Sequence, residues 1–184
     1  MRAIFCDRDG VINVDHGYVY RWEDFHFHQG VPEALALLKK QGWLLILVTN
    51  QSGIARGFYD EEAFQALTNK MQSYLKAKSA EFDAIYYCPH LPDAAVQQFS
   101  LVCRCRKPGP EMFERAQASL GLSMTNSVCV GDNPTDIQAA KAAGVGKTLG
   151  VGDEASFRQC PPDECFSEPK AALLRILESS PTPR

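Results

Sequence analysis

Short apolar runs alternate along this chain with stretches whose apolar residues recur at helical spacing, and this alternation constrains the fold most. The runs are short enough to be buried strands, and they cover residues 2–6, 43–49, 84–87, 127–130 and 148–151. Strands that alternate with helices pair in parallel, because each crossover helix returns the chain to the same end of the sheet. The sequence therefore predicts an α/β fold, a doubly wound (Rossmann-like) parallel sheet with helices on both faces.

The predicted helices begin near Pro32, after Asp60 and before Met112, and two more cover residues 134–143 and 170–178. Asp60 is a good N-cap for the second helix. A chain of 184 residues suits one domain with a sizeable core. We therefore expect a single domain over residues 1–178, followed by a flexible Pro/Ser-rich tail over residues 179–184.

Composition excludes several classes of function. The chain is 45% hydrophobic and 22% charged with a net charge of -3, so neither nucleic acid nor a membrane surface is an expected partner. No signal peptide is evident, and the apolar runs are too short to cross a bilayer. We expect a monomer in the cytoplasm. Its seven cysteines are an odd number and do not suggest a disulfide framework; Cys6 and Cys129 are expected in the core, and Cys160 and Cys165 in a loop.

The first strand ends in two carboxylates, Asp7 and Asp9. Open α/β sheets bind their ligands at the carboxyl ends of the strands. Paired carboxylates at such a position suggest a Mg²⁺ site together with a nucleophile or an acid–base group. Since Asp and Gly are also ordinary turn residues, the pair alone favours function only modestly.

Three later strand ends carry further polar groups. Residues 49–53 (TNQSG) offer a hydroxyl, two amides and a flexible backbone that suit an anion. Arg106 and Lys107 precede a helix N-terminus, which adds to the positive potential there. Asp132 and Asp136 follow the fourth strand. Each group alone has an ordinary explanation as a turn, a solvated basic pair or a helix-end charge, but turns do not readily explain all of them together.

Two long loops leave the carboxyl ends of strands, and both are expected to lie over Asp7. The first covers residues 10–30 and contains Asp15-His16-Gly17-Tyr18. The second contains three cysteines and a histidine, which form a closed structural zinc set: Cys88, His90, Cys103 and Cys105. Four unrelated loop residues are a weaker alternative, because clustered cysteines in a cytosolic loop usually bind metal. A redox role is also weaker, since no C-x-x-C is present. The zinc would fix a loop with little core and direct Arg106 and Lys107.

The segments DRDG, VTNQSG, RKP and GDNPTD, in this order, resemble the four motifs of the haloacid-dehalogenase (HAD) superfamily of phosphotransferases. The resemblance extends from about Arg2 to Val151. No cap domain fits within residues 10–30, so the chain resembles the capless branch. With the cysteine loop and the runs INVDHGYV, TNQSGIARG and IYYCPH, it is similar to the zinc-loop sugar bisphosphate phosphatases of that branch.

This resemblance implies a Mg²⁺-dependent phosphoric monoester hydrolase that removes the 7-phosphate of a heptose 1,7-bisphosphate in lipopolysaccharide precursor synthesis. It implies that Asp7 is the nucleophile, that Asp9 is the acid–base group and that Thr49 and Lys107 stabilise the transferred phosphate. Mg²⁺ would be held by the Asp7 carboxylate, the Asp9 backbone carbonyl and the Asp132 carboxylate, with Asp136 orienting Lys107 or a water.

The implied contacts with the phosphosugar are Asp15, His16, Gly17, Tyr18, Asn50, Gln51, Ser52, Arg106 and Asn133. Many relatives carry Lys where this chain has Asn133, which can donate a hydrogen bond but brings no charge. Three alternatives remain. Histidinol-phosphate phosphatases have a similar metal loop, a catalytically silent metal-stabilised module would need a broken motif, and a phosphomutase would usually need a cap to exclude water.

Overall fold

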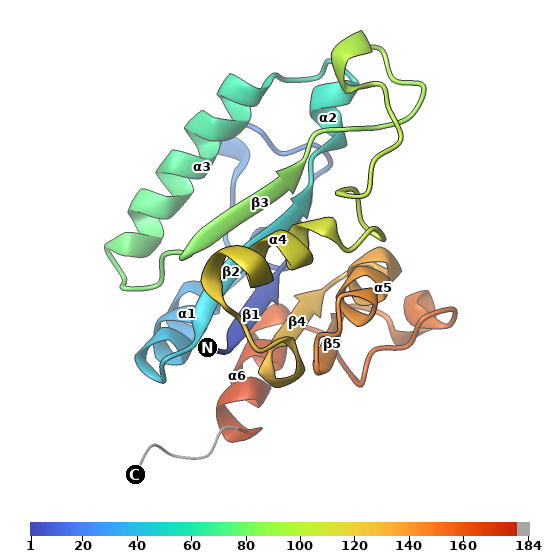
Figure 1. Cartoon of the computed structure of the whole chain (residues 1–184). Coiled ribbons are helices and arrows are strands. Elements are labelled where there is room, and N and C mark those ends of the chain that lie inside the picture. Colours follow the sequence, from blue (N-terminus) through green and yellow to red (C-terminus); the bar gives the residue numbers. More distant parts are fainter. Residues whose placement is uncertain (180–184) are drawn as a thin grey trace.

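The structure is a computed structural model that describes residues 1–179, and it contains a six-stranded parallel sheet with the strand order β3-β2-β1-β4-β5-β6 (Figure 1). The strands are β1 (Ala3–Cys6), β2 (Leu44–Asn50), β3 (Ala84–Cys88), β4 (Val128–Gly131), β5 (Lys147–Val151) and β6 (Glu164–Phe166). Every neighbouring pair is parallel. The predicted doubly wound sheet is confirmed.

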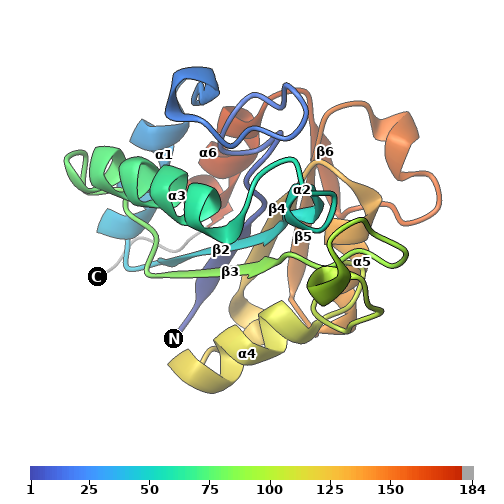
Figure 2. The ribbon, with the colours of Figure 1, turned by 90° about the horizontal axis from the view of Figure 1, so that it is seen from above.

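Helices cover both faces of the sheet. They are α1 (Val31–Lys40), α2 (Ser52–Ala55), α3 (Glu61–Lys76), α4 (Glu111–Leu120), α5 (Pro134–Ala142) and α6 (Pro169–Ser179). Seen from above, α1, α3 and α6 lie on one side of the sheet, and α4 and α5 lie on the other (Figure 2). The predicted cap of α3 is present, since the Asp60 carboxylate accepts a hydrogen bond from the Ala63 N–H at 2.8 Å.

The central strand β1 shows why the core is divided in two. Ile4 and Cys6 belong to the core under α1, α3 and α6, whereas Ala3 and Phe5 belong to the core under α4 and α5. Successive side chains of a strand point to opposite faces, so a strand covered on both faces is apolar throughout. The Phe5 ring packs on Phe113 of α4 with 4.8 Å between ring centroids.

The sequence did not predict two of these elements. The edge strand β6 is only half-buried and has no apolar run, so the sequence carries no sign of it. Cys165 therefore lies in a strand, although we expected it in a loop. Helix α2 has four residues, too few to show a helical period. Of the predicted tail, Ser179 ends α6, and residues 180–184 lie outside the described residues.

The segment between β1 and α1 contains one short 3₁₀ turn, Trp22–Asp24, and within residues 1–179 no cap domain is inserted there. Among residues 1–179, no helix has the length and apolarity needed to cross a membrane.

Strand order places the site. From β1 the chain builds outward through β2 and β3, and it then returns to β4 on the other side of β1. A crevice opens where the strand order reverses, outside the carboxyl ends of the two central strands. Asp7 directly follows β1 and Asp132 directly follows β4. The Asp7 N–H donates to the Val130 carbonyl at 3.1 Å, which holds the two strand ends together.

Adjacent leucines of α1 provide a test of this packing. Leu38 is fully buried and Leu37 is 48% exposed. Leu38→Ala leaves a cavity and should lower the free energy of unfolding by about 2–5 kcal/mol. Leu37→Ala should change it by less than about 0.5 kcal/mol. Urea unfolding of both variants measures the difference, and equal losses would contradict the assigned faces of α1.

Candidate active site

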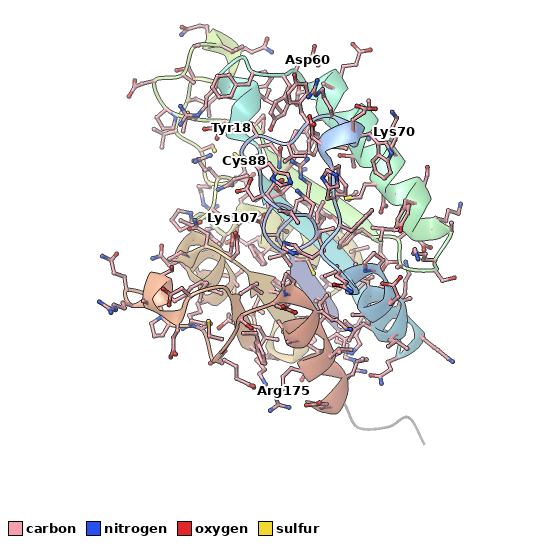
Figure 3. The ribbon with its side chains drawn as sticks, turned by 180° about the vertical axis from the view of Figure 1, so that it is seen from behind. Tyr18, Asp60, Lys70, Cys88, Lys107 and Arg175 are labelled. Atoms are coloured by element: carbon pink, nitrogen blue, oxygen red, sulfur yellow. The ribbon has the colours of Figure 1, made fainter. Side chains whose placement is uncertain are left out.

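A cavity of about 470 Å³ opens at the carboxyl ends of the strands. All the residues predicted for catalysis, Mg²⁺ and substrate line it except Thr49 and His16. Thr49 is buried beneath the cavity, and the exposed His16 ring packs on His26 at 5.7 Å. The expectation that both long loops lie over Asp7 is therefore met. In Figure 3, Lys107 lies between Tyr18 in the upper part of the molecule and Arg175 at the bottom.

The buried ammonium of Lys107 lies at the centre of the site. Its Nζ donates to Asp7 Oδ1 at 2.8 Å and to the Val48 carbonyl at 2.8 Å, and it pairs with Asp136 Oδ1 at 2.6 Å. These three acceptors match its three N–H groups. Burial alone would lower the pKa of Lys107, but Asp136 and Asp7 outweigh burial and raise this pKa above its usual value. Lys107 is therefore a permanent cation.

Three carboxylates surround this cation. Ligand oxygens of Asp7, Asp132 and Asp136 lie within 4.8 Å of one another. Burial, opposed by Lys107, raises the pKa of Asp7 to about 7, and burial together with Asp7 and Asp136 raises the pKa of Asp132 to about 8. A hard divalent cation stabilises the ionised form of such crowded carboxylates, because it offsets their mutual repulsion. These residues therefore fit Mg²⁺.

Asp136 has a different role from the other two carboxylates. Its Oδ1 pairs with Lys107, and its Oδ2 accepts from the Asn133 N–H at 3.0 Å in the capping box of α5. Both oxygens are thus engaged by protein groups. This arrangement favours Asp7 and Asp132 as the metal-holding carboxylates and Asp136 as the residue that orients Lys107.

A hydrogen-bond chain orients Thr49. The Tyr59 hydroxyl donates to Gln51 Oε1 at 2.6 Å, which turns the Gln51 amide N–H groups to Thr49 Oγ1 at 2.9 Å and to Asp9 Oδ2 at 3.0 Å. Thr49 Oγ1 accepts this bond, so its own proton is not used in it. Tyr59 was not predicted, because nothing in its local sequence distinguishes it from a core aromatic residue.

Asn50 joins the second and third motifs. Its Oδ1 accepts from the Lys107 N–H at 3.0 Å, and its Nδ2 donates to the Lys107 carbonyl at 3.1 Å. This reciprocal pair fixes the backbone that carries the buried ammonium. Its predicted contact with substrate stays a prediction, as does that of Asn133, whose Oδ1 accepts from the Thr135 N–H at 3.1 Å.

The predicted zinc ligands come together beside the cavity. The Cys105 Sγ lies 3.2 Å from the sulfurs of Cys88 and Cys103 and 3.3 Å from His90 Nδ1. A tetrahedral zinc site with Zn–S bonds near 2.3 Å separates its ligands by roughly 3.7 Å, so this group fits zinc with small adjustments. Arg106 joins this loop through its N–H to Cys103 Sγ at 3.4 Å and through Nη1 to the His90 carbonyl at 3.3 Å.

Comparisons with known proteins agree with this geometry. A family model described as HAD-hydrolase-like matches residues 104–159. A protein of Vibrio cholerae serotype O1 named D-glycero-beta-D-manno-heptose-1,7-bisphosphate 7-phosphatase is 55% identical over 147 residues, covering 80% of this chain and 79% of that protein. A protein of the same name from Escherichia coli K12 is 51% identical over 144 residues, covering 78% and 75%.

A solved structure extends the likeness to nearly the whole chain. The D,D-heptose 1,7-bisphosphate phosphatase from B. bronchiseptica, complexed with magnesium and phosphate, has a TM-score of 0.85 and 32% sequence identity. The match covers 98% of this chain and 100% of that one.

The raised carboxylate pKa values predict how Mg²⁺ stabilises the fold. Between about pH 4 and pH 8, folded Asp7 and Asp132 hold protons that the unfolded chain has lost, so their contribution to stability falls as pH rises through this window. Mg²⁺ binds the ionised carboxylates and relieves this loss. The rise in Tm on adding Mg²⁺ to chelator-treated protein should therefore be larger at about pH 8.5 than at about pH 5.5. Asp132→Asn is the control that should reduce the difference, and a Tm rise independent of pH would contradict the assignment.

Zinc content tests the cysteine loop. Elemental analysis should find about one zinc per chain, because four protein ligands close a structural site. Cys103→Ser should lower both zinc content and Tm. Cys165→Ser is the matched control, since Cys165 lies in β6 outside this group, and it should retain the metal. Zinc-free protein with unchanged Tm and activity would contradict a structural role for the metal.

Proposed function

Since the chain belongs to the family of D-glycero-β-D-manno-heptose-1,7-bisphosphate 7-phosphatases, we propose that it removes the 7-phosphate of D-glycero-D-manno-heptose 1,7-bisphosphate, in the supply of heptose for lipopolysaccharide. The relatives are named for the β anomer, and we expect the same anomer here. The observation that carries the proposal is the contact of Lys107 with Asp7 at the floor of a polar cavity. We further propose a cytoplasmic monomer.

The reaction proceeds in two displacements on phosphorus. An Asp7 oxygen attacks the 7-phosphate, the bond from phosphorus to the sugar oxygen breaks, and Asp9 gives that oxygen a proton. The product of this step is an aspartyl-phosphate. Water then attacks the same phosphorus atom and Asp9 takes a proton from this water. The bond from phosphorus to the Asp7 oxygen breaks, which releases inorganic phosphate and restores the Asp7 carboxylate. Both carboxylates line the cavity, which supports these roles.

An anionic nucleophile and an anionic phosphate repel each other, so the site must offset charge. Lys107 holds the Asp7 carboxylate from below, and the Thr49 hydroxyl donates to a phosphate oxygen. Asp7, the Asp9 carbonyl and Asp132 would hold Mg²⁺, which would supply further positive charge to the site. The structural zinc would be held by the four loop ligands and takes no part in the chemistry.

The rim of the cavity would hold the remainder of the substrate. Arg106 suits the 1-phosphate, because a guanidinium binds phosphate through two parallel hydrogen bonds. Asn133 would add an uncharged hydrogen bond. The first long loop supplies Asp15 and Tyr18 to the rim, and Ser52 at the start of α2 faces the same cavity, so we assign all three to the sugar hydroxyls.

Phosphate release from purified protein tests the proposal. The kcat/KM value should be highest for the heptose 1,7-bisphosphate, with the 1-phosphate retained in the product, and lower for histidinol phosphate. Asp7→Asn keeps the size of the side chain but removes the attacking charge, so activity should fall by more than about a thousandfold. The variant should still fold, because Asp136 continues to pair with Lys107, and Tm measured alongside checks this.

Asp60→Asn is the matched control for this substitution. Asp60 caps α3 at the surface, Asn caps nearly as well, and activity should be unchanged. Preference for histidinol phosphate would overturn the proposed substrate, and Asp7→Asn activity within about tenfold of wild type would overturn the proposed nucleophile.

A further inference from the structure

Arg8, which lies between the two carboxylates of the first motif, has the largest side chain among the fully buried residues. It is 1% exposed, and a guanidinium is almost never buried so completely unless it is paired. The proposed reaction gives Arg8 no part. A buried charge is costly to retain, so the groups that pair with the Arg8 guanidinium must offset this cost.

The Arg8 guanidinium donates hydrogen bonds to both oxygens of the Asp9 carboxylate. Nε lies 3.3 and 3.2 Å from Oδ1 and Oδ2 of Asp9, and Nη2 lies 3.0 Å from both. The same Nη2 donates to the Val19 carbonyl at 2.6 Å. The guanidinium carbon lies 5.9 Å from the centre of the Phe64 ring. Arg8 therefore binds the acid–base carboxylate and the first long loop at once.

Two further donors complete the setting of Asp9. Asn13 Nδ2 donates to Oδ1 at 3.0 Å and Gln51 Nε2 to Oδ2 at 3.0 Å. The Asp9 side chain stays 21% exposed and lines the cavity. Arg8 thus holds it from the protein side and leaves part of it open to substrate. Val19, whose carbonyl Arg8 also binds, directly follows Tyr18 at the cavity rim.

We propose that Arg8 is a positioning residue that holds the Asp9 carboxylate in register with the sugar oxygen and ties that position to the first long loop. This inference rests on the proposed function, in which Asp9 gives and takes the proton. The planar guanidinium of Arg8 donates to both oxygens of the Asp9 carboxylate and to the Val19 carbonyl. A lysine ammonium is a compact point charge without this geometry, so Arg8→Lys keeps the charge and loses the alignment.

The test compares two leaving groups through kcat/KM, which covers the steps up to release of the alcohol. A sugar alkoxide needs a proton from Asp9, whereas p-nitrophenolate leaves without one. Arg8→Lys and Arg8→Met should lose at least about tenfold in kcat/KM on the heptose bisphosphate and less than about threefold on p-nitrophenyl phosphate. Asp9→Asn is the reference, with a loss of about a hundredfold or more confined in the same way to the sugar substrate.

Arg21→Lys is the matched control, because Arg21 forms an exposed pair with Asp24 in the same loop, and it should leave both substrates unaffected. Equal losses on both substrates in Arg8→Lys, or no loss, would overturn the role of Arg8 while Asp9→Asn still discriminates. Failure of Asp9→Asn to discriminate would overturn the proposed acid–base residue and this inference with it. Should Arg8→Met fail to fold, Arg8→Lys decides, with Tm as the check on folding.

Discussion

The buried ammonium of Lys107 is the interaction on which the rest of the site depends. It contacts the residue after β1, the carbonyl of Val48 in β2 and the first turn of α5. Asp7 and Asp136 would otherwise face each other as like charges in a poorly solvated crevice. Removing one partner from such a buried network typically costs about 3–5 kcal/mol, because it leaves an uncompensated charge. Lys107 therefore fixes the ends of the central elements as well as Asp7, the proposed nucleophile.

Lys107 reaches this position from a loop that has little core of its own. In this segment, the described core includes Cys88 and Cys105, which are themselves members of the metal-binding group. A metal clip can replace the apolar contacts that a short loop lacks. The Asn50 side chain then locks the Lys107 backbone through its reciprocal hydrogen bonds. With zinc bound, as we propose, this loop would act on catalysis through position, because it sets where the chain leaves Cys105.

Much of this arrangement could be predicted from the sequence, for a physical reason. Strands β1, β2 and β4 are covered on both faces and are apolar up to their carboxyl ends. Because the carboxyl ends of parallel strands meet, Asp7, Thr49 and Asp132 converge. Edge strand β6 has no such pattern. The position of Tyr59 and the grip of Arg8 on Asp9 depend on the path of loops, which periodicity does not encode. His16 was predicted from its neighbours, but adjacent residues of an irregular loop need not face the same cavity.

Two glycines allow the carboxylates of this site to lie close to the backbone and to one another. A Cβ on Gly10, whose φ is +84°, would lie 2.0 Å from Asp132 Oδ2, and one on Gly131 would lie 2.3 Å from the Asp136 Cβ. The carboxylates of Asp132 and Asp136 therefore pack closely against bare backbone. On the Asp136 side the chain supplies a fixed cation, Lys107. On the Asp132 side it leaves oxygen donors that suit an exchangeable one. The phosphate would then enter between Lys107, which holds the proposed nucleophile Asp7, and an exchangeable Mg²⁺.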